Sequence, residues 1–146
     1  MKQILSNDII NQYMPTLVKC PLFNTLGEPE LRSYLNNAKV IIHSYQKNDF
    51  IALAGDPMEG IGVILEGSAL LTRENVMGQR VIMANLEQSD IFGEALLFSK
   101  QPLWPATIKA TKATKIMFIP LETFIKTLPD CHQCQTKILS NLLEDL

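Results

Sequence analysis

The chain has 146 residues, of which 47% are hydrophobic and 19% are charged, and its formal net charge at pH 7 is −2. This length suits a single domain with helical appendages, and the composition excludes an intrinsically disordered chain. The mildly acidic balance also excludes a domain that binds DNA by itself, because phosphate binding needs a basic surface.

Nothing in the sequence points to a membrane. No apolar run approaches the roughly 20 residues that span a bilayer, and the first residues are too polar for a signal peptide. We therefore expect a cytoplasmic protein without a membrane partner.

Two short helices are predicted within residues 1–37. The second covers 28–37 and begins with Glu28-Pro29-Glu30, an acidic and proline-tolerant pattern typical of a first helical turn. The first covers 7–18 and has apolar residues at helical spacing, namely Ile9, Ile10, Tyr13, Met14 and Leu17.

From Ala38 the pattern changes to short strand-like runs separated by turn residues. Glu66-Gly67 lies between two runs and predicts a tight hairpin, because glycine tolerates positive φ. The rhythm predicts a mainly β fold with flanking helices, an antiparallel β-roll or jelly-roll barrel over 38–120. The runs are 39–43, 50–54, 62–65, 68–73, 80–86 and 107–119.

After Pro120 the apolar spacing becomes helical again. Residues 121–146 are expected to begin a C-terminal helix, whose apolar stripe would join two copies into a homodimer. The alternative, that the stripe folds back on its own barrel, stays open. The residues expected in the dimer interface are Phe124, Ile138, Leu139, Leu142, Leu143 and Leu146.

Residues 90–107 carry the groups suited to holding a ligand. Gly93 lets the backbone approach a ligand closely, and a short helix starting at Glu94 would direct free N–H groups at an anion. The carboxylate of Glu94 can accept hydrogen bonds from sugar hydroxyls. The expected ligand-binding residues are Phe92, Gly93, Glu94, Ala95, Leu96, Leu103, Trp104, Pro105, Ala106 and Thr107.

Five pieces of the chain, in this order, resemble the cyclic-nucleotide-binding domain of the Crp/Fnr family of bacterial transcription regulators. They are 20–23 (Cys-Pro-Leu-Phe), Gly55-Asp56, 63–67 (Val-Ile-Leu-Glu-Gly), 90–94 (Asp-Ile-Phe-Gly-Glu) and Ala106-Thr107. The resemblance covers nearly the whole chain. It implies an effector-sensing and dimerisation domain with a phosphate-binding-cassette-like segment at 90–107.

The resemblance also implies a two-state device. An effector bound beside the cassette would shift the barrel against the helix over 124–146 and reset two DNA-binding domains across a dimer. Relatives carry a helix-turn-helix domain after this helix, and no such segment occurs here. We expect the sensor half of a longer regulator, with DNA as a partner only through that domain; a stand-alone sensor is the alternative.

Family members that bind cyclic nucleotides use a cassette arginine to pair with the cyclic phosphate. Here Leu103 follows Pro102, and counting back from Ala106 places Trp104 at the arginine position. Losing one partner of a buried charge pair typically costs about 2–5 kcal/mol. We therefore expect that neither cAMP nor cGMP is the effector.

Without that arginine, the cassette would need another cation or a different kind of ligand. Arg73 and Arg80 lie near a predicted hairpin tip and are poor substitutes for the arginine. Trp104 would instead close over an apolar or aromatic small molecule, or it would fill the nucleotide's space and leave the domain without a ligand. A true nucleotide site with an atypical cassette, and a ligand-free interaction module, remain alternatives.

No enzymatic, metal-dependent or cofactor-dependent function is expected. A cupin enzyme needs clustered histidines, and His43 and His132 are the only two. Cys131-His132-Gln133-Cys134 has a spacing known from metal and redox sites, but structural zinc takes four ligands. Cys20, which is distant in sequence, also cannot complete an iron–sulfur site. We expect free thiols and no catalytic residue.

Overall fold

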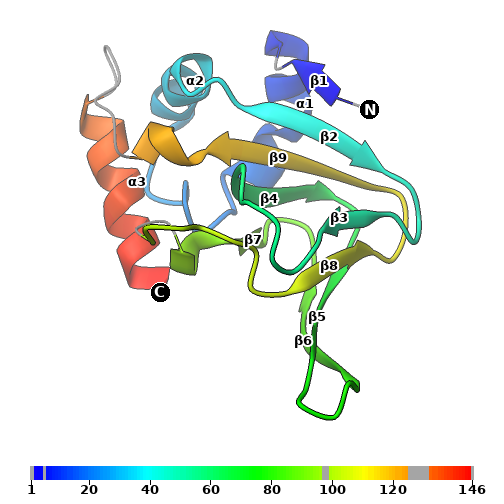
Figure 1. Ribbon diagram of the computed structural model, residues 1–146. Helices are drawn as coiled ribbons and strands as arrows, with labels where there is room; N and C mark the ends of the chain where they lie inside the picture. Colours follow the sequence, from blue (N-terminus) through cyan, green and yellow to red (C-terminus); the bar gives the residue numbers. More distant parts are fainter. Residues whose placement is uncertain (1, 5, 97–98, 125–131, 146) are drawn as a thin grey trace.

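The helices gather beside two antiparallel β-sheets in the computed structural model, which describes residues 2–4, 6–96, 99–124 and 132–145 (Figure 1). Both predicted N-terminal helices form. Helix α1 (Asn7–Leu17) begins after Ser6, whose Oγ accepts a hydrogen bond from the backbone N–H of Ile9 at 3.3 Å. Helix α2 (Glu28–Asn37) has a proline in its first turn.

Within the described residues, nine strands form the two sheets. The first sheet has the order β1, β2, β9, β4, β7 and the second β3, β8, β5, β6, with antiparallel pairing throughout. The predicted mainly β fold with flanking helices is thereby confirmed. The strands are β1 (Lys2–Ile4), β2 (Ile41–Tyr45), β3 (Phe50–Ala52), β4 (Gly60–Glu66), β5 (Ala69–Glu74), β6 (Arg80–Leu86), β7 (Ile91–Phe92), β8 (Thr107–Ala110) and β9 (Thr114–Pro120).

Two details of the strand prediction were wrong. Glu66-Gly67 does not close a hairpin, because β4 and β5 belong to different sheets and the turn between them is a corner. Gly67 has φ +97°, and a Cβ there would lie 2.5 Å from the carbonyl oxygen of Ala113. The run 107–119 is likewise two strands, one in each sheet, because the chain crosses over between Ala110 and Thr114.

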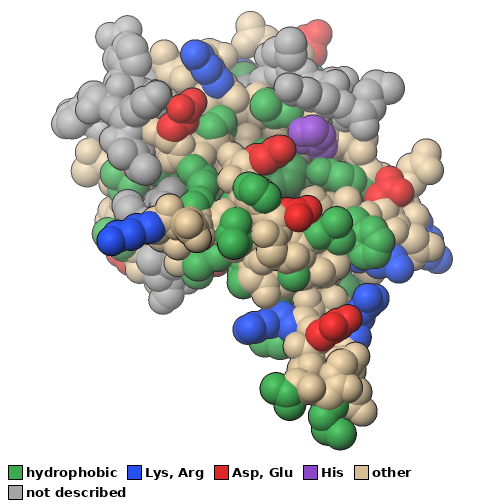
Figure 2. Space-filling view, viewed as in Figure 1, with side chains coloured by type: hydrophobic (Ala, Val, Ile, Leu, Met, Phe, Trp, Pro, Cys, Tyr) green, Lys and Arg blue, Asp and Glu red, His purple; other side chains and the backbone are tan. Residues whose placement is uncertain are grey.

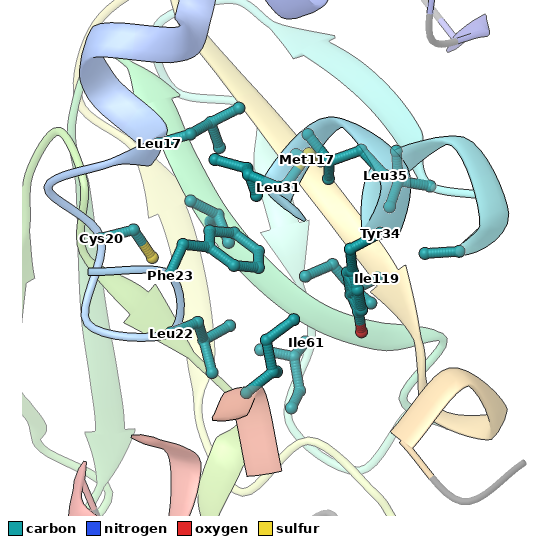
Figure 3. Packing of buried hydrophobic residues seen from close by; sticks show 14 of the residues in the cluster. Leu17, Cys20, Leu22, Phe23, Leu31, Tyr34, Leu35, Ile61, Met117 and Ile119 are labelled. Carbon is teal, nitrogen blue, oxygen red and sulfur yellow. The ribbon is translucent and has the colours of Figure 1, made fainter. Parts of the chain in front are cut away.

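The buried apolar residues form two clusters. The helix-side cluster lies between the helices and the five-stranded sheet, and Figure 3 shows Phe23, Leu31 and Tyr34 directed toward Ile61 of β4 and Ile119 of β9. The inter-sheet cluster lies between the two sheets. Its members are Ala52, Met58, Ile64, Ala69, Leu86, Phe92, Trp104, Ile108, Ile116 and Phe118.

Strand β4 separates these clusters through the alternation of its side chains. Ile61, Val63 and Leu65 belong to the helix-side cluster, whereas Ile64 belongs to the inter-sheet cluster. Gly62 lies on the same face of β4 as Ile64, and an added Cβ there would lie 2.1 Å from Cζ of Phe92. The glycine therefore makes room for an aromatic ring that comes from the cassette.

The apolar stripe of the C-terminal helix packs on its own chain. This is the alternative to a dimer interface that the sequence left open. Ile138 and Leu142 on α3 (His132–Asp145) are fully buried in the helix-side cluster, and Phe124 of the 3₁₀ turn η2 (Leu121–Phe124) is buried there too. These three residues were expected in a dimer interface, but their own domain covers them.

The rest of α3 confirms that the helix is anchored on the N-terminal region. The side-chain amide of Asn141 donates to the carbonyl oxygen of Leu22 at 2.9 Å and to Oγ1 of Thr25 at 2.8 Å. Leu139 is half-buried and packs against the same cluster, whereas Leu143 is 60% exposed and lies on the open face of the helix. Leu146 lies outside the described residues.

Within the described part of the chain, no helix has the length and apolar character to cross a membrane. Nor do the described histidine, cysteine and acidic residues include a group of three that could hold a metal ion. Cys20 is fully buried. The side chains of Cys131, His132 and Cys134 lie outside the described part.

Candidate functional site

The cassette begins at β7, which pairs with β4 and buries Phe92. Gly93 follows with φ +92°, a conformation that favours glycine. The helix expected from Glu94 is a single 3₁₀ turn, η1 (Glu94–Leu96). So short a turn supplies no helix-dipole site for an anion. Glu94 and Leu96 are half-buried and Ala95 is exposed.

The far end of the cassette is held by the Gly55-Asp56 turn, another piece of the family resemblance. The backbone N–H of Trp104 donates to the carbonyl oxygen of Asp56 at 2.8 Å, and that of Gly55 donates to the carbonyl oxygen of Trp104 at 2.8 Å. The backbone N–H of Met58 donates to the carbonyl oxygen of Pro102 at 2.8 Å. Leu103 forms an isolated antiparallel β-bridge with Pro57. These contacts fix the backbone on both sides of Trp104.

The side chain of Trp104 points inward and packs on Phe92 and Gly93 at the beginning of the cassette. The indole is 7% exposed, and its ring centroid lies 5.8 Å from that of Phe92. A Cβ added at Gly93 would lie 3.2 Å from Cζ3 of Trp104 and 2.9 Å from Cε of Met58. The structure thus brings Phe92, Gly93 and Trp104 together, and the indole lies directly over the glycine backbone.

The remaining predicted ligand residues are divided between core and surface. Ala106 is buried, Leu103 is 42% exposed and Pro105 is exposed. Thr107 is half-buried, and its Oγ1 accepts a hydrogen bond from the backbone N–H of Ala54 at 3.2 Å. Most of these side chains therefore do not converge on one point.

Sequence reasoning set aside two arginines that the structure places beside the cassette. Arg73 and Arg80 line a cavity of about 410 Å³ together with Pro105 and Thr107 from the end of the cassette. The strand register explains this, because β5 pairs with both β6 and β8, so that Thr72 lies opposite Thr107. A hairpin pattern alone does not reveal which third strand lies alongside.

A second cavity, of about 340 Å³, has Trp104 in its wall. Its other lining residues come from β2, β3, β9 and the turn that contains Asp56 and Glu59. Burial raises the pKa of the Tyr45 hydroxyl in this wall to about 12, and the negative charges of Glu59 and Asp49 act in the same direction. The surroundings of Trp104 are therefore aromatic and acidic on this side.

Comparison with known proteins places these features in a family. The model described as "Cyclic nucleotide-binding domain" matches residues 42–130, which include the whole of 90–107. The chain is 31% identical over 106 residues, 70% of its length, to the cAMP-activated global transcriptional regulator CRP of Pasteurella multocida, of which 50% is covered. The chain spans half or less of the curated relatives that it matches.

Solved structures agree on the fold. A cyclic nucleotide-binding domain from Methylobacillus flagellatus has a TM-score of 0.79 at 17% identity, over 98% of this chain and 80% of that one. The sensor domain of the transcriptional regulator DNR from Pseudomonas aeruginosa has a TM-score of 0.73 at 20% identity, covering 95% and 91%.

A third similar structure is the regulatory subunit of a cAMP-independent protein kinase A from Trypanosoma brucei. Its TM-score is 0.74 at 17% identity, covering 92% of this chain and 46% of that one. That protein carries three substitutions, one of which introduces an arginine, and is bound to cAMP in its A site.

Proposed function

Because the chain belongs to the cyclic nucleotide-binding domain family, we propose that it is the effector-sensing domain of a Crp/Fnr-like transcription regulator that does not respond to cAMP. The relatives named above are regulators and regulatory subunits, which supports a role in signalling without catalysis. DNA binding would belong to a further domain, and the effector would be a small molecule.

One observation carries the proposal: Trp104, which counting back from Ala106 assigns to the arginine position, is a buried tryptophan. The indole of Trp104 covers Gly93 and contacts Phe92, so it fills space at the cassette opening and brings no positive charge. A cyclic phosphate there would lose its solvation without gaining a cation in return. An uncharged or cationic effector fits these surroundings better than a nucleotide.

The proposed signal runs from the cassette to α3. This helix is tied to the N-terminal region by Asn141 and by the ion pair of Lys137 with Glu30, whose Nζ and Oε1 are 2.9 Å apart. An effector that shifts the barrel against α3 would change these contacts and so change the setting of a following domain.

A homodimer is part of this proposal, and two apolar surfaces of the single chain support it. One is the open face of α3 with Leu143. The other is the β5–β6 hairpin, which projects beyond the other strands in Figure 1. Its exposed apolar side chains are Val76, Met77, Val81, Ile82 and Met83.

Isothermal titration with cAMP and with cGMP tests the proposal directly. We expect no saturable binding by the wild-type chain up to about 1 mM nucleotide, and micromolar binding of either one would overturn it. Trp104→Arg should gain cAMP binding, by analogy with the arginine-carrying Trypanosoma protein. Trp104→Leu removes the indole without adding a cation, so cAMP binding by this control would contradict the role given to charge.

A second candidate function is a nucleotide-binding domain with an atypical cassette, favoured by the cavity that Arg73 and Arg80 line with Thr107. Guanidinium groups bind phosphate oxygens well, and here two of them border the cassette. If the wild-type chain binds cAMP, Arg73→Ala with Arg80→Ala should abolish that binding. Lys112→Ala, in the β8–β9 connection, serves as the control for lost positive charge.

A further inference from the structure

The cavity beside Trp104 has walls of aromatic rings. Five rings line it: His43, Tyr45, Phe50, Trp104 and Phe118. The His43 ring stacks on that of Tyr45, with centroids 6.2 Å apart and planes inclined by 28°, and meets the Phe118 ring edge-on at 5.7 Å. Trp104 and Phe118 are buried, so their rings are held in place by the inter-sheet cluster.

Two carboxylates border the same cavity. Asp56 and Glu59 are both exposed and lie on the turn that holds the cassette end. Among the described residues, the ion pairs involve Glu30 and Glu66 but neither of these two. The lining residues that the structure describes include neither lysine nor arginine. Figure 2 shows acidic side chains interspersed with apolar side chains over the centre of this face, above the projecting hairpin.

The local charge is consequently negative. Burial first, and then the charges of Glu59 and Asp49, raise the pKa of the Tyr45 hydroxyl to about 12, so this group is neutral at physiological pH. Aromatic faces also carry negative potential and attract cations, most strongly where water is excluded. The Nζ of Lys109 lies 5.6 Å from the centroid of the Phe50 ring, and Lys109 is not among the residues that line the cavity.

We propose that this cavity binds a small organic cation, with an alkylammonium or quaternary ammonium group against the rings of Trp104, Tyr45 and Phe118. Asp56 and Glu59 would attract and orient it from the rim. The volume of about 340 Å³ lies at the lower end of the range for ligand pockets, roughly 300–1,000 Å³. A ligand of a few carbon atoms suits this size, and a phosphate-bearing ligand is disfavoured by the two carboxylates.

Cation binding in this cavity does not require that the cassette lacks its arginine. The test of the cavity is therefore independent of the proposed function. It does share Trp104 with the cassette, since the same indole covers Gly93. A cation bound here would therefore contact the cassette through one rigid side chain.

Choline and its uncharged isostere 3,3-dimethyl-1-butanol are matched probes, because they differ in charge and hardly in shape. Trp104 is the only tryptophan, so its fluorescence reports on the cavity directly, and calorimetry measures the affinity. We expect saturable binding of choline with a change in tryptophan emission, and at least about tenfold weaker binding of the isostere.

Variants at the rim sharpen the assignment without disturbing the core. Asp56→Asn with Glu59→Gln should weaken choline binding by about tenfold or more. Glu87→Gln, an exposed carboxylate outside this cavity, is the matched control and should change it by less than about twofold. Phe50→Leu removes a half-exposed ring and should also weaken binding.

Three results would each overturn the proposal. One is equal affinity for choline and the isostere, which would mean an apolar pocket without selection for charge. Another is unchanged choline binding in the double carboxylate variant. The third is a folded wild-type chain that binds neither probe up to about 10 mM.

Discussion

The helix-side and inter-sheet clusters are both buried, yet they are built differently. The helix-side cluster is mostly aliphatic and joins all three helices to β4 and β9. The inter-sheet cluster centres on Phe92, Trp104 and Phe118, with Phe92 packed against Gly62. The helix-side cluster is filled by its side chains alone. The inter-sheet cluster also needs a glycine at position 62, because any side chain there would clash with the Phe92 ring.

We expect the helix-side cluster to serve the stability of the domain and the inter-sheet cluster to serve ligand binding as well. The helix-side cluster holds α3 against the domain, whereas residues of the inter-sheet cluster form the wall beside His43 and Tyr45. Pro105 and Thr107, next to Trp104 in the chain, border the arginine-lined cavity. Substitutions in the first cluster should therefore change stability, and those in the second should also change ligand binding.

The largest effect is expected from Leu142→Lys in α3. Leu142 is fully buried in the helix-side cluster, and a lysine there would place an unpaired charge in an apolar core. Such a change should destabilise the domain by about 4 kcal/mol or more, measured by urea unfolding. The earlier expectation that Leu142 belongs to a dimer interface predicts a folded monomer instead, and that outcome would contradict the packing.

Leu143→Lys is the control on the next residue, which is 60% exposed. Its effect on the free energy of unfolding should stay within about 0.5 kcal/mol. If the chain forms a homodimer through the open face of α3, light scattering should show half the mass for this variant. A wild-type chain that is monomeric at high concentration would count against the homodimer.

A smaller effect is expected where the inter-sheet cluster depends on a glycine. Gly62→Ala places a Cβ 2.1 Å from Cζ of Phe92, so the ring must move. Overpacking of this kind costs about 1–3 kcal/mol, and the movement should also alter the fluorescence of Trp104, whose ring lies 5.8 Å away.

A double-mutant cycle tests the reason for that cost. Phe92→Leu is smaller at the clashing position, so Gly62→Ala should cost less in its presence than in the wild type. Strictly additive free energies of unfolding would show that Gly62 is needed for another reason than the Phe92 ring.

The sequence predicted the helix-side cluster far better than the cassette region, and the reason is physical. Helical spacing identified Ile10, Tyr13 and Leu17 on α1 as apolar and inward, because periodicity reports which side chains share a face. Periodicity does not report which surface will cover that face. The stripe with Ile138 and Leu142 was therefore assigned to a partner copy, although the chain's own helices cover it.

The cassette region required information that only the pairing of strands contains. Glycine at 67 suggested a turn of the right kind, but only the topology shows that the turn joins two sheets. Arg73 and Arg80 lie near the tip of the β5–β6 hairpin, as predicted, but the hairpin pattern does not reveal that β8 brings Thr107 beside them from far along the chain. Trp104 is buried at the cassette, which agrees equally with both alternatives drawn from its position, closing over an effector or filling the nucleotide's space.

A moderate effect is expected for Asn141→Ala, which tests how firmly α3 is tied down. The Asn141 amide is buried and donates to the carbonyl oxygen of Leu22 and to Thr25. Removing it leaves a buried carbonyl without this donor, which should cost about 1–3 kcal/mol in thermal or urea unfolding. Thr25→Ala should cost less, because the bond to Leu22 remains; an equal cost would assign the anchoring to Thr25.

The smallest effect concerns the surface tie of the same helix. The hydrogen-bonded ion pair with Lys137 lowers the pKa of the Glu30 carboxyl below its ordinary value of 4.5, and the backbone N–H of Gly27 adds to this. A carboxyl with a lowered pKa in the folded state stabilises the fold above that ordinary value and loses this contribution as the pH falls through its own pKa.

Glu30→Gln should therefore lower the unfolding temperature slightly at pH 7, and the difference from the wild type should vanish in acid well below pH 4.5. Added salt should shrink the difference at pH 7, because the pair is partly exposed. Lys137→Met should reproduce the same pH profile if the ion pair is the cause. A difference that persists in acid would mean that Glu30 supports α2 through its place in the first turn rather than through its contact with α3.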